Sequence, residues 1–272
     1  MNVSQLAINS VSTRQAGLEE ALHAYAAAGF RQVEFQLGHL KDWLAQDHTI
    51  ADAAVLLASH GLRCIGGFQA AVECFSTPDA QRANHQIHRD NAALLQALGG
   101  GTLAVGTDGP PQPSLAALDT IGDTIAGLAG TLEAPDVTIA VEFNWSPIVR
   151  SLHSAVRVVE RADHPRVGVL FDPAHYYVTP TKFEHLTAGT VRWIKHVHLD
   201  DMRDKPGELS HCNADRVLPG QGVLDLPAII ARLEEFGYDG WYAIEMFSEE
   251  LWQTPVADAA CACYQSLLPL CR

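Results

Sequence analysis

The hydrophobic residues of this 272-residue chain fall into short apolar runs that alternate with longer segments of helical periodicity. Short apolar runs bounded by turn residues are typical of buried strands, whereas apolar residues recurring every third or fourth position are typical of amphipathic helices. The expected strands are Gln5–Asn9, Gln32–Phe35, Arg63–Gly67, Thr102–Val105, Val137–Glu142, Val167–Phe171, Ile194–Leu199 and Trp241–Ile244. The expected helices are Gly17–Ala28, Thr49–His60, Pro78–Leu98, Pro113–Leu132, Ser151–Ala162, a shorter one near Thr181–Ala188, Leu226–Phe236 and Pro255–Leu268.

Glycines mark the ends of several of these helices. Gly29 and Gly61 each follow a helical segment, and Gly237 does so before the last strand. Glycine most readily adopts the left-handed conformation that closes a helix. A strand followed by a helix, repeated eight times, predicts a parallel sheet that closes on itself. We therefore expect an α/β fold, a single (β/α)8 TIM barrel formed by residues 1–272 as one domain.

The composition supports a folded chain and argues against several partners. Hydrophobic residues make up 47% and charged residues only 18%, which is enough apolar surface for a large core. The net charge is −14 and no basic run is present, so a nucleic-acid partner is not expected. No apolar stretch approaches a membrane span, and the first residues lack a signal-peptide pattern. The six cysteines are irregularly spaced, which favours reduced thiols in a cytoplasmic protein.

Four expected strands in the second half end on groups that bind metals. These residues are Glu142, Asp172, His198 and Glu245. Active sites of such barrels lie at the C-terminal ends of the strands, and neighbouring strand ends are close in space. Each residue alone has an ordinary structural explanation, but four at matching positions predict a metal site. Three carboxylates and one imidazole suit one divalent metal ion such as Mn²⁺, Co²⁺, Zn²⁺ or Mg²⁺.

Two more histidines lie close to these positions in the sequence. His196 precedes His198 by two residues, so both point to the same face of the strand, with His196 deeper in the barrel. We expect His196 to pack or to donate a hydrogen bond rather than to bind the metal. His175 follows Asp172 by three residues, and it either faces a substrate oxygen or forms a hydrogen bond within its loop.

Charged residues after the seventh strand offer two alternatives each. Arg216 is one of few cations near the strand ends, and it either anchors a substrate oxyanion or pairs with Asp215. The Asp200–Asp201 pair either supports His198 or binds Arg216 and Lys205.

Four segments carry a family resemblance: FDPAH, HVHLDDMRDKP, DRVLPGQGVLDL and YDGWYAIEMFSEELW. They resemble the sugar phosphate isomerase/epimerase superfamily with the xylose-isomerase-like TIM barrel, and within it the 2-keto-myo-inositol isomerases of inositol catabolism. The resemblance implies that the four strand-end residues are the metal ligands and that His175 and Arg216 contact the substrate. Asn144–Trp145 and Tyr176–Tyr177 do not match that family and are candidates for lining a differently shaped pocket; Trp145, Tyr176 and Tyr177 either stack on a sugar or cyclitol ring or pack the loops.

The resemblance implies a sugar or cyclitol (inosose-like) isomerase or epimerase that moves a proton through an enediolate. Glu142 and Glu245 are then the candidate catalytic base and acid. A metal-dependent dehydratase or lyase of a keto-cyclitol or 3-dehydroshikimate-like substrate begins with the same proton removal. A metal-dependent endonuclease needs a basic DNA face, and the net charge of −14 argues against it. A non-catalytic sugar-binding barrel needs no pair of catalytic carboxylates, so the presence of Glu142 and Glu245 argues against this alternative. Oligomeric state is not fixed by the sequence, but the resemblance allows a homo-oligomer.

Overall fold

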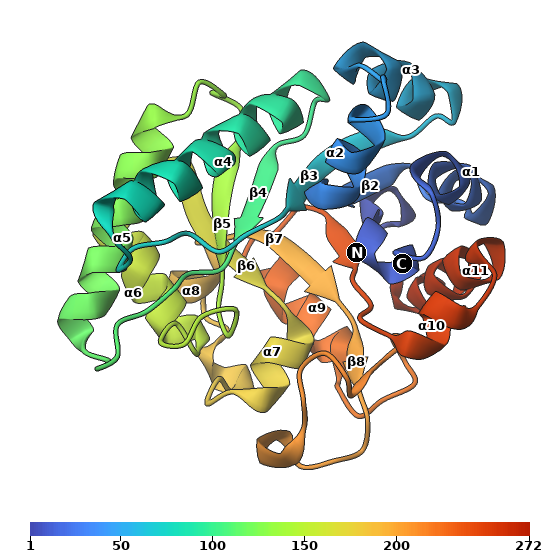
Figure 1. Cartoon of the computed structure of the whole chain (residues 1–272). Helices are drawn as coiled ribbons and strands as arrows, with labels where there is room; N and C mark the ends of the chain where they lie inside the picture. Colours follow the sequence, from blue (N-terminus) through green and yellow to red (C-terminus); the bar gives the residue numbers. More distant parts are fainter.

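The computed structural model describes residues 1–272 and contains a closed barrel of eight parallel strands (Figure 1). Its order of hydrogen-bonded strands is β1-β10-β7-β6-β5-β4-β3-β2, and β2 pairs with β1 to close the barrel. Each predicted strand is present, with ends that differ by at most one residue, so the predicted fold class is confirmed. The bounds are β1 Leu6–Asn9, β2 Gln32–Gln36, β3 Arg63–Phe68, β4 Thr102–Val105, β5 Thr138–Glu142, β6 Val167–Phe171, β7 Ile194–Leu199 and β10 Tyr242–Ile244.

Helices surround the barrel and connect its strands (Figure 1). They are α1 Leu18–Ala28, α2 Leu37–Leu44, α3 Ile50–Ser59, α4 Pro78–Ala97, α5 Leu115–Thr131, α6 Leu152–Ala162, α7 Pro173–Val178, α8 Ala188–Val191, α9 Leu226–Glu235, α10 Glu249–Gln253 and α11 Val256–Leu267. Gly61 and Gly237 follow their helices with φ of +65° and +90°, as the capping argument predicts. The sequence did not predict α2, α7 and α10.

The short helix expected near Thr181–Ala188 is not an α-helix; only a 3-10 turn lies within this range. A helical turn, α7, instead begins directly after β6, because the Asp172 side chain accepts the His175 amide and Pro173 occupies the first turn. The chain then forms a 3-10 turn at Phe183–His185 before α8. A second difference is a two-stranded antiparallel ribbon after β7, formed by β8 (Asp201–Met202) and β9 (Arg216–Val217).

Most of the apolar core lies between the barrel and its helices, in one cluster of 65 buried residues. Two small clusters contain strand residues that pack away from this main core: Ala7, Ile65 and Ala243, and then Ala104, Ala140 and Leu170. Ala7 pairs with Ala243 and Ala104 pairs with Ala140 in the ladder, so small residues line these parts of the sheet.

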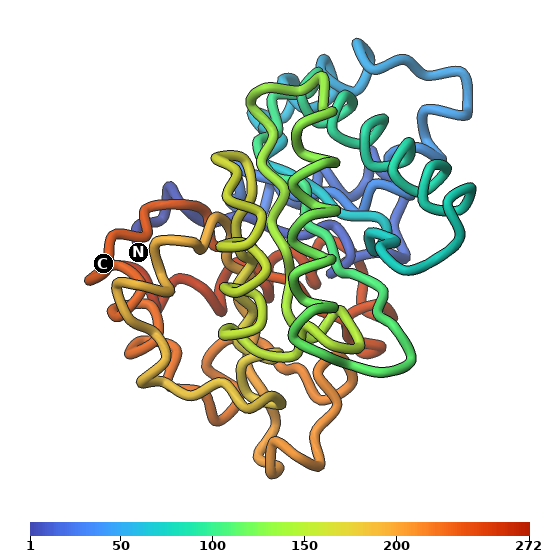
Figure 2. Tube along the Cα trace, turned by 90° about the vertical axis from the view of Figure 1, so that its left-hand side faces the viewer, coloured from blue at the N-terminus to red at the C-terminus, as the bar shows by residue number.

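The two ends of the chain lie side by side beside α11 (Figures 1 and 2). The Arg272 amide donates a hydrogen bond of 3.1 Å to the Met1 carbonyl, and the Met1 amino group contacts Glu234 at 2.6 Å. All six cysteines are free thiols. None of the helices has the length and hydropathy that crossing a bilayer requires.

Candidate metal centre

The four predicted ligands converge at the C-terminal ends of their strands. Glu142 is the last residue of β5, Asp172 and Glu245 directly follow β6 and β10, and His198 lies near the end of β7. One donor atom of each lies within 4.8 Å of all the others, and all four side chains are buried. The His198 Nδ1 atom is 3.2 Å from Glu245 Oε2, 3.5 Å from Glu142 Oε1 and 3.6 Å from Asp172 Oδ2.

The donor set fits a divalent cation. Burial alone would raise the pKa of Glu142, but His175 and His198 outweigh it and lower that pKa to about 2. Burial is likewise outweighed at Asp172, whose pKa is lowered, chiefly by Arg216. Glu142 Oε1 and His198 Nδ1 are both buried without a hydrogen bond. Unpartnered buried acceptors are rare and costly, and a metal ion would coordinate both of these atoms.

Asp172 has two tasks, one for each carboxylate oxygen. Its Oδ1 atom accepts the His175 amide at 3.0 Å and so begins α7, while Oδ2 faces the site and accepts from Arg216 at 2.9 Å. The turn that α7 makes thus places His175 over the same group of carboxylates. Its Nε2 atom lies 3.4 Å from Glu142 Oε1.

The orientation of the His175 ring is set by Asn144. The Asn144 side-chain amide nitrogen lies 2.9 Å from His175 Nδ1; in the neutral ring Nδ1 accepts from this amide, and the ring proton on Nε2 faces Glu142. Asn144 follows β5 with φ of +71°, a left-handed conformation that asparagine tolerates better than most residues. Burial opposes the charged ring, but Asp172 and Glu142 raise the pKa of His175 well above its ordinary value.

Arg216 is buried among the carboxylates of the site. Its Nη1 atom donates to Glu245 Oε2 at 2.9 Å and contacts Asp200 Oδ2 at 2.9 Å. Burial alone would lower the pKa of Arg216, but Asp172, Asp200 and Glu245 raise it well above its ordinary value. Arg216 also lines the pocket, together with Glu142, His198 and Glu245, although most of its donors already contact the chain's own acceptors.

The alternative pairing of Arg216 with Asp215 is wrong, because Asp215 Oδ2 contacts Lys205 at 2.8 Å. The adjacent aspartates after β7 also have different partners. Asp200 accepts the Ala174 amide and pairs with Arg216, and burial raises its pKa although Arg216 opposes this. Asp201 instead accepts backbone amides of the loop after β9 and contacts neither His198 nor Lys205.

A pocket of about 290 Å³ is lined by three of the four predicted ligands, Glu142, His198 and Glu245. Aromatic and polar residues that the sequence reasoning did not select form much of its wall. These are Phe68, Cys212, Asn213 and Phe247. Trp145 also lines the pocket and packs edge-to-face on Phe68, as the ring-stacking alternative requires.

Tyr176 and Tyr177 do not line this pocket. Tyr176 packs against Phe171, and the Tyr177 hydroxyl donates to the Lys205 carbonyl at 2.7 Å. For these two residues the loop-packing alternative is therefore the correct one.

Two polar residues of the first strands, Asn9 and Glu34, are buried directly beneath the ligands, and sequence reasoning missed both. Glu34 accepts hydrogen bonds from His196 and His198, and Asn9 connects Glu34 to Glu245. The hydrogen-bonding role expected of His196 is thus present. The available signal was a glutamate flanked by apolar residues in the QVEFQ run, because an ionised side chain is rarely buried without partners.

Comparison with known proteins identifies the family. Residues 22–267 match the family described as xylose isomerase-like TIM barrel. The chain is similar to inosose isomerase of Bacillus subtilis, with 31% identity over 140 residues that cover 50% of each chain. It is also similar to inosose dehydratase of Geobacillus thermodenitrificans, with 28% identity over 137 residues, 47% of this chain and 46% of the relative. The chain thus matches about half the length of these curated relatives.

Solved structures support the same fold. The crystal structure of IOLI protein with a binding zinc atom superimposes with a TM-score of 0.87 at 22% identity, covering 98% of this chain and 97% of that one. A structure of L-ribulose 3-epimerase superimposes with a TM-score of 0.77 at 20% identity, covering 99% and 94%. At these identities the likeness concerns the fold alone. With nearly the whole chain matched, the protein belongs to the xylose isomerase-like TIM barrel family.

Proposed function

We propose that this protein is a divalent-metal-dependent isomerase or epimerase of a sugar or cyclitol, with an inosose-like substrate. The observation that carries the proposal is the buried group of three carboxylates and one imidazole beneath a pocket of about 290 Å³. The similarity to an inosose isomerase supports the substrate class.

Glu142, Asp172, His198 and Glu245 would hold the cation. When bound, it would act as a Lewis acid that stabilises the negative charge developing on the substrate oxygens as the proton next to the carbonyl leaves. The zinc in the related fold is compatible with this donor set, and so are Mn²⁺, Co²⁺ and Mg²⁺. The identity of the ion is therefore a matter for metal analysis.

Glu142 and Glu245 are the proposed proton carriers, and the structure holds them differently. Glu142 Oε1 makes no hydrogen bond and is the oxygen that would hold the cation, which would leave Oε2 to accept a proton from the substrate. Glu245 is held at both oxygens, with Oε1 accepting from Asn9 at 3.1 Å and Oε2 from Arg216 at 2.9 Å. One carboxylate would take the proton next to the carbonyl, and the other carboxyl group, in its acid form, would deliver a proton to the neighbouring carbon of the enediolate. The hydroxyl proton would pass to the former carbonyl oxygen, and exchange with solvent would restore both carboxyl groups.

The pocket wall suits a neutral polyhydroxy ring. Phe68, Trp145 and Phe247 offer apolar faces for the ring carbons, and Asn213 offers an amide for its hydroxyl groups. Arg216 is already neutralised by carboxylates of the chain, so it is a poor partner for a phosphate. We assign the binding of substrate oxygens to His175 and to the part of Arg216 that lines the pocket.

A dehydratase is the second candidate, because one curated relative is an inosose dehydratase. Both reactions begin with removal of the proton next to the carbonyl. They differ in whether a neighbouring hydroxyl then leaves as water. The pocket residues that contact this hydroxyl would determine which of the two reactions follows.

Incubation of the metal-loaded protein with inososes and ketoses in D2O tests the proposal. An isomerase incorporates deuterium next to the carbonyl and conserves the remaining mass, whereas a dehydratase gives a product that has lost water; NMR and mass spectrometry distinguish them. Glu245→Gln should slow exchange about 10²–10⁴-fold. Glu235→Gln, at an exposed glutamate on α9, is the matched control. Wild-type exchange in Glu245→Gln would refute the proton-carrier role, and activity unaffected by a chelator would refute the metal-dependent mechanism.

A further inference from the structure

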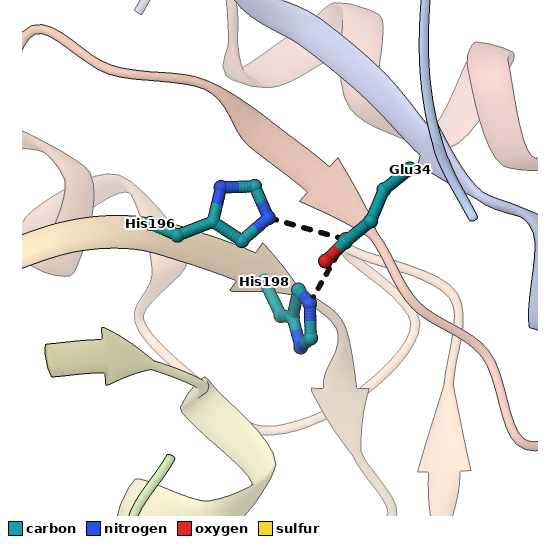
Figure 3. Close-up of side chains that lie close together, drawn as sticks. All are labelled: Glu34, His196 and His198. Carbon is teal, nitrogen blue, oxygen red and sulfur yellow. Dashed lines mark hydrogen bonds and ion pairs between the residues drawn. The ribbon is translucent and has the colours of Figure 1, made fainter. Parts of the chain in front are cut away.

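Glu34 on β2 is a fully buried carboxylate that three side chains contact through one oxygen (Figure 3). His196 Nε2 and His198 Nε2 each lie 3.1 Å from Glu34 Oε2. The Asn9 side-chain amide donates to the same oxygen at 3.1 Å. Figure 3 shows both rings projecting from β7 towards this carboxylate.

The contact with Glu34 determines which nitrogen of His198 can bind a metal. A carboxylate only accepts hydrogen bonds, so the ring proton must be on Nε2. A neutral imidazole then presents a lone pair at Nδ1, and this atom faces the oxygens of Glu142, Asp172 and Glu245. Among carboxylate oxygens this atom requires a positive charge, either a bound cation or a second ring proton.

Glu34 also acts on Glu245 through Asn9. The two hydrogens of the Asn9 amide go to Glu34 Oε2 and to Glu245 Oε1, each at 3.1 Å. The amide cannot be reversed, because its oxygen accepts the Val11 amide at 3.0 Å. Glu245 is therefore rotated so that Oε2 faces His198 Nδ1.

We propose that Glu34 is the positioning residue of the metal centre: it fixes the His198 tautomer and, through Asn9, the orientation of Glu245. This inference rests on the metal-binding part of the proposed function, but on no substrate. Partners of this kind raise the basicity of the ligand and fix its ring, and their loss typically weakens metal binding about 10–100-fold.

Glu34, His196 and His198 are also close enough together to hold a second ion. Three observations favour hydrogen bonding instead. Glu34 and His196 are fully buried and neither of them lines the pocket. The Asn9 amide donates to the oxygen that the ion would need. Metal at both nitrogens of His198 would require the ring to lose both of its protons.

Metal affinity measures this inference without any substrate. Titration of the metal-free protein with Zn²⁺ by calorimetry should show Glu34→Gln binding about 10–100-fold more weakly than wild type. The visible spectrum of the Co²⁺-loaded variant should also change, because the ligand geometry differs. His196→Gln is the matched control: it removes another buried donor to Glu34 and should stay within about threefold of wild type. Equal losses of zinc affinity in both variants would show that Glu34 only stabilises the fold, and would overturn the inference.

A measurement on wild-type protein decides the matter if Glu34→Gln does not fold. In ¹⁵N-histidine NMR of the zinc-loaded protein, His198 should be protonated at Nε2 and metal-bound at Nδ1. Metal at Nε2, or a second zinc that disappears in His196→Gln, would overturn the inference. Tight zinc binding without turnover of any inosose or ketose would refute the proposed activity and leave the role of Glu34 intact.

Discussion

The two halves of the barrel contribute to the same site in different ways. Strands β5, β6, β7 and β10 end at or next to the four residues that form the group of donors. In contrast, β1 and β2 contribute Asn9 and Glu34, which bond those residues from below, and β3 and β4 contribute the apolar wall residues Phe68 and Ala104. The second half thus supplies the donor atoms. The first half orients the residues that carry them and forms part of the pocket wall.

Two buried histidines show what this division means for charge. His198, in the second half, is surrounded by carboxylates; burial opposes its charge, but Glu245 and Glu34 raise its pKa well above the ordinary value. His88, on α4 in the first half, has the Ala71 carbonyl as its hydrogen-bond partner, and burial lowers its pKa to about 4. Equal burial therefore gives opposite pKa shifts, and the neighbouring charges decide the direction.

The largest effect on stability should come from the positive charge of the second half. Arg216→Met keeps an unbranched side chain but leaves Asp172 and Glu245 without their cation. Leaving a buried charge unpaired typically costs about 3–5 kcal/mol. Chemical denaturation of the metal-free protein should show a loss of this size, and a bound divalent cation should restore part of it.

Arg203→Met is the matched control, because Arg203 is exposed on the loop after β8. Its free energy of unfolding should stay within about 0.5 kcal/mol of wild type. If Arg216→Met changed the free energy of unfolding as little as Arg203→Met, Arg216 would not stabilise the buried carboxylates of the second half. The contrast between the two halves would then be contradicted.

This contrast also explains how much could be predicted from sequence alone. The eight strands and the convergence of the four donors could be predicted, because each donor lies at the end of an apolar run and the barrel brings such positions together. Glu34 was not readable as a partner of His198, because 164 residues separate them and only closure of the barrel brings β2 opposite β7. Predictions from residue type alone were only partly correct. Of the aromatic residues considered for ring stacking, Trp145 lines the pocket, whereas Tyr176 packs against Phe171.

The pH dependence of stability tests the contrast between the histidines. The ordinary pKa of His88 is 6.5, and folding lowers it to about 4. The unfolded chain therefore binds the extra proton between these values, so the stability contributed by His88 is present above pH 6.5 and is lost as the pH falls to 4. The full loss is about 3 kcal/mol. His88→Leu cannot titrate, so the difference in unfolding free energy between wild type and variant should decline over this range; a flat difference would refute the burial argument.

Asp201 shows that a carboxylate of the second half can be near the predicted ligand His198 in sequence and still stabilise the fold. Its Oδ1 atom accepts the amides of Met202 and Leu224 at 2.8 and 2.9 Å. Its Oδ2 atom accepts those of Gly220 and Gly222 at 3.1 and 3.0 Å. This one side chain therefore holds the loop that follows β9 against the end of β7.

The smallest effect is expected for Asp201→Asn. The asparagine amide has one acceptor oxygen and presents N–H groups to backbone amides that also donate, so two of the four hydrogen bonds are lost. We expect a loss of about 2 kcal/mol in the free energy of unfolding, while Asp204→Asn, at an exposed position, stays within about 0.5 kcal/mol. Zinc affinity should be unchanged, because Asp201 contacts none of the four donors. Loss of zinc affinity without loss of stability would instead place Asp201 with the ligands and enlarge the part of the second half that serves the ion.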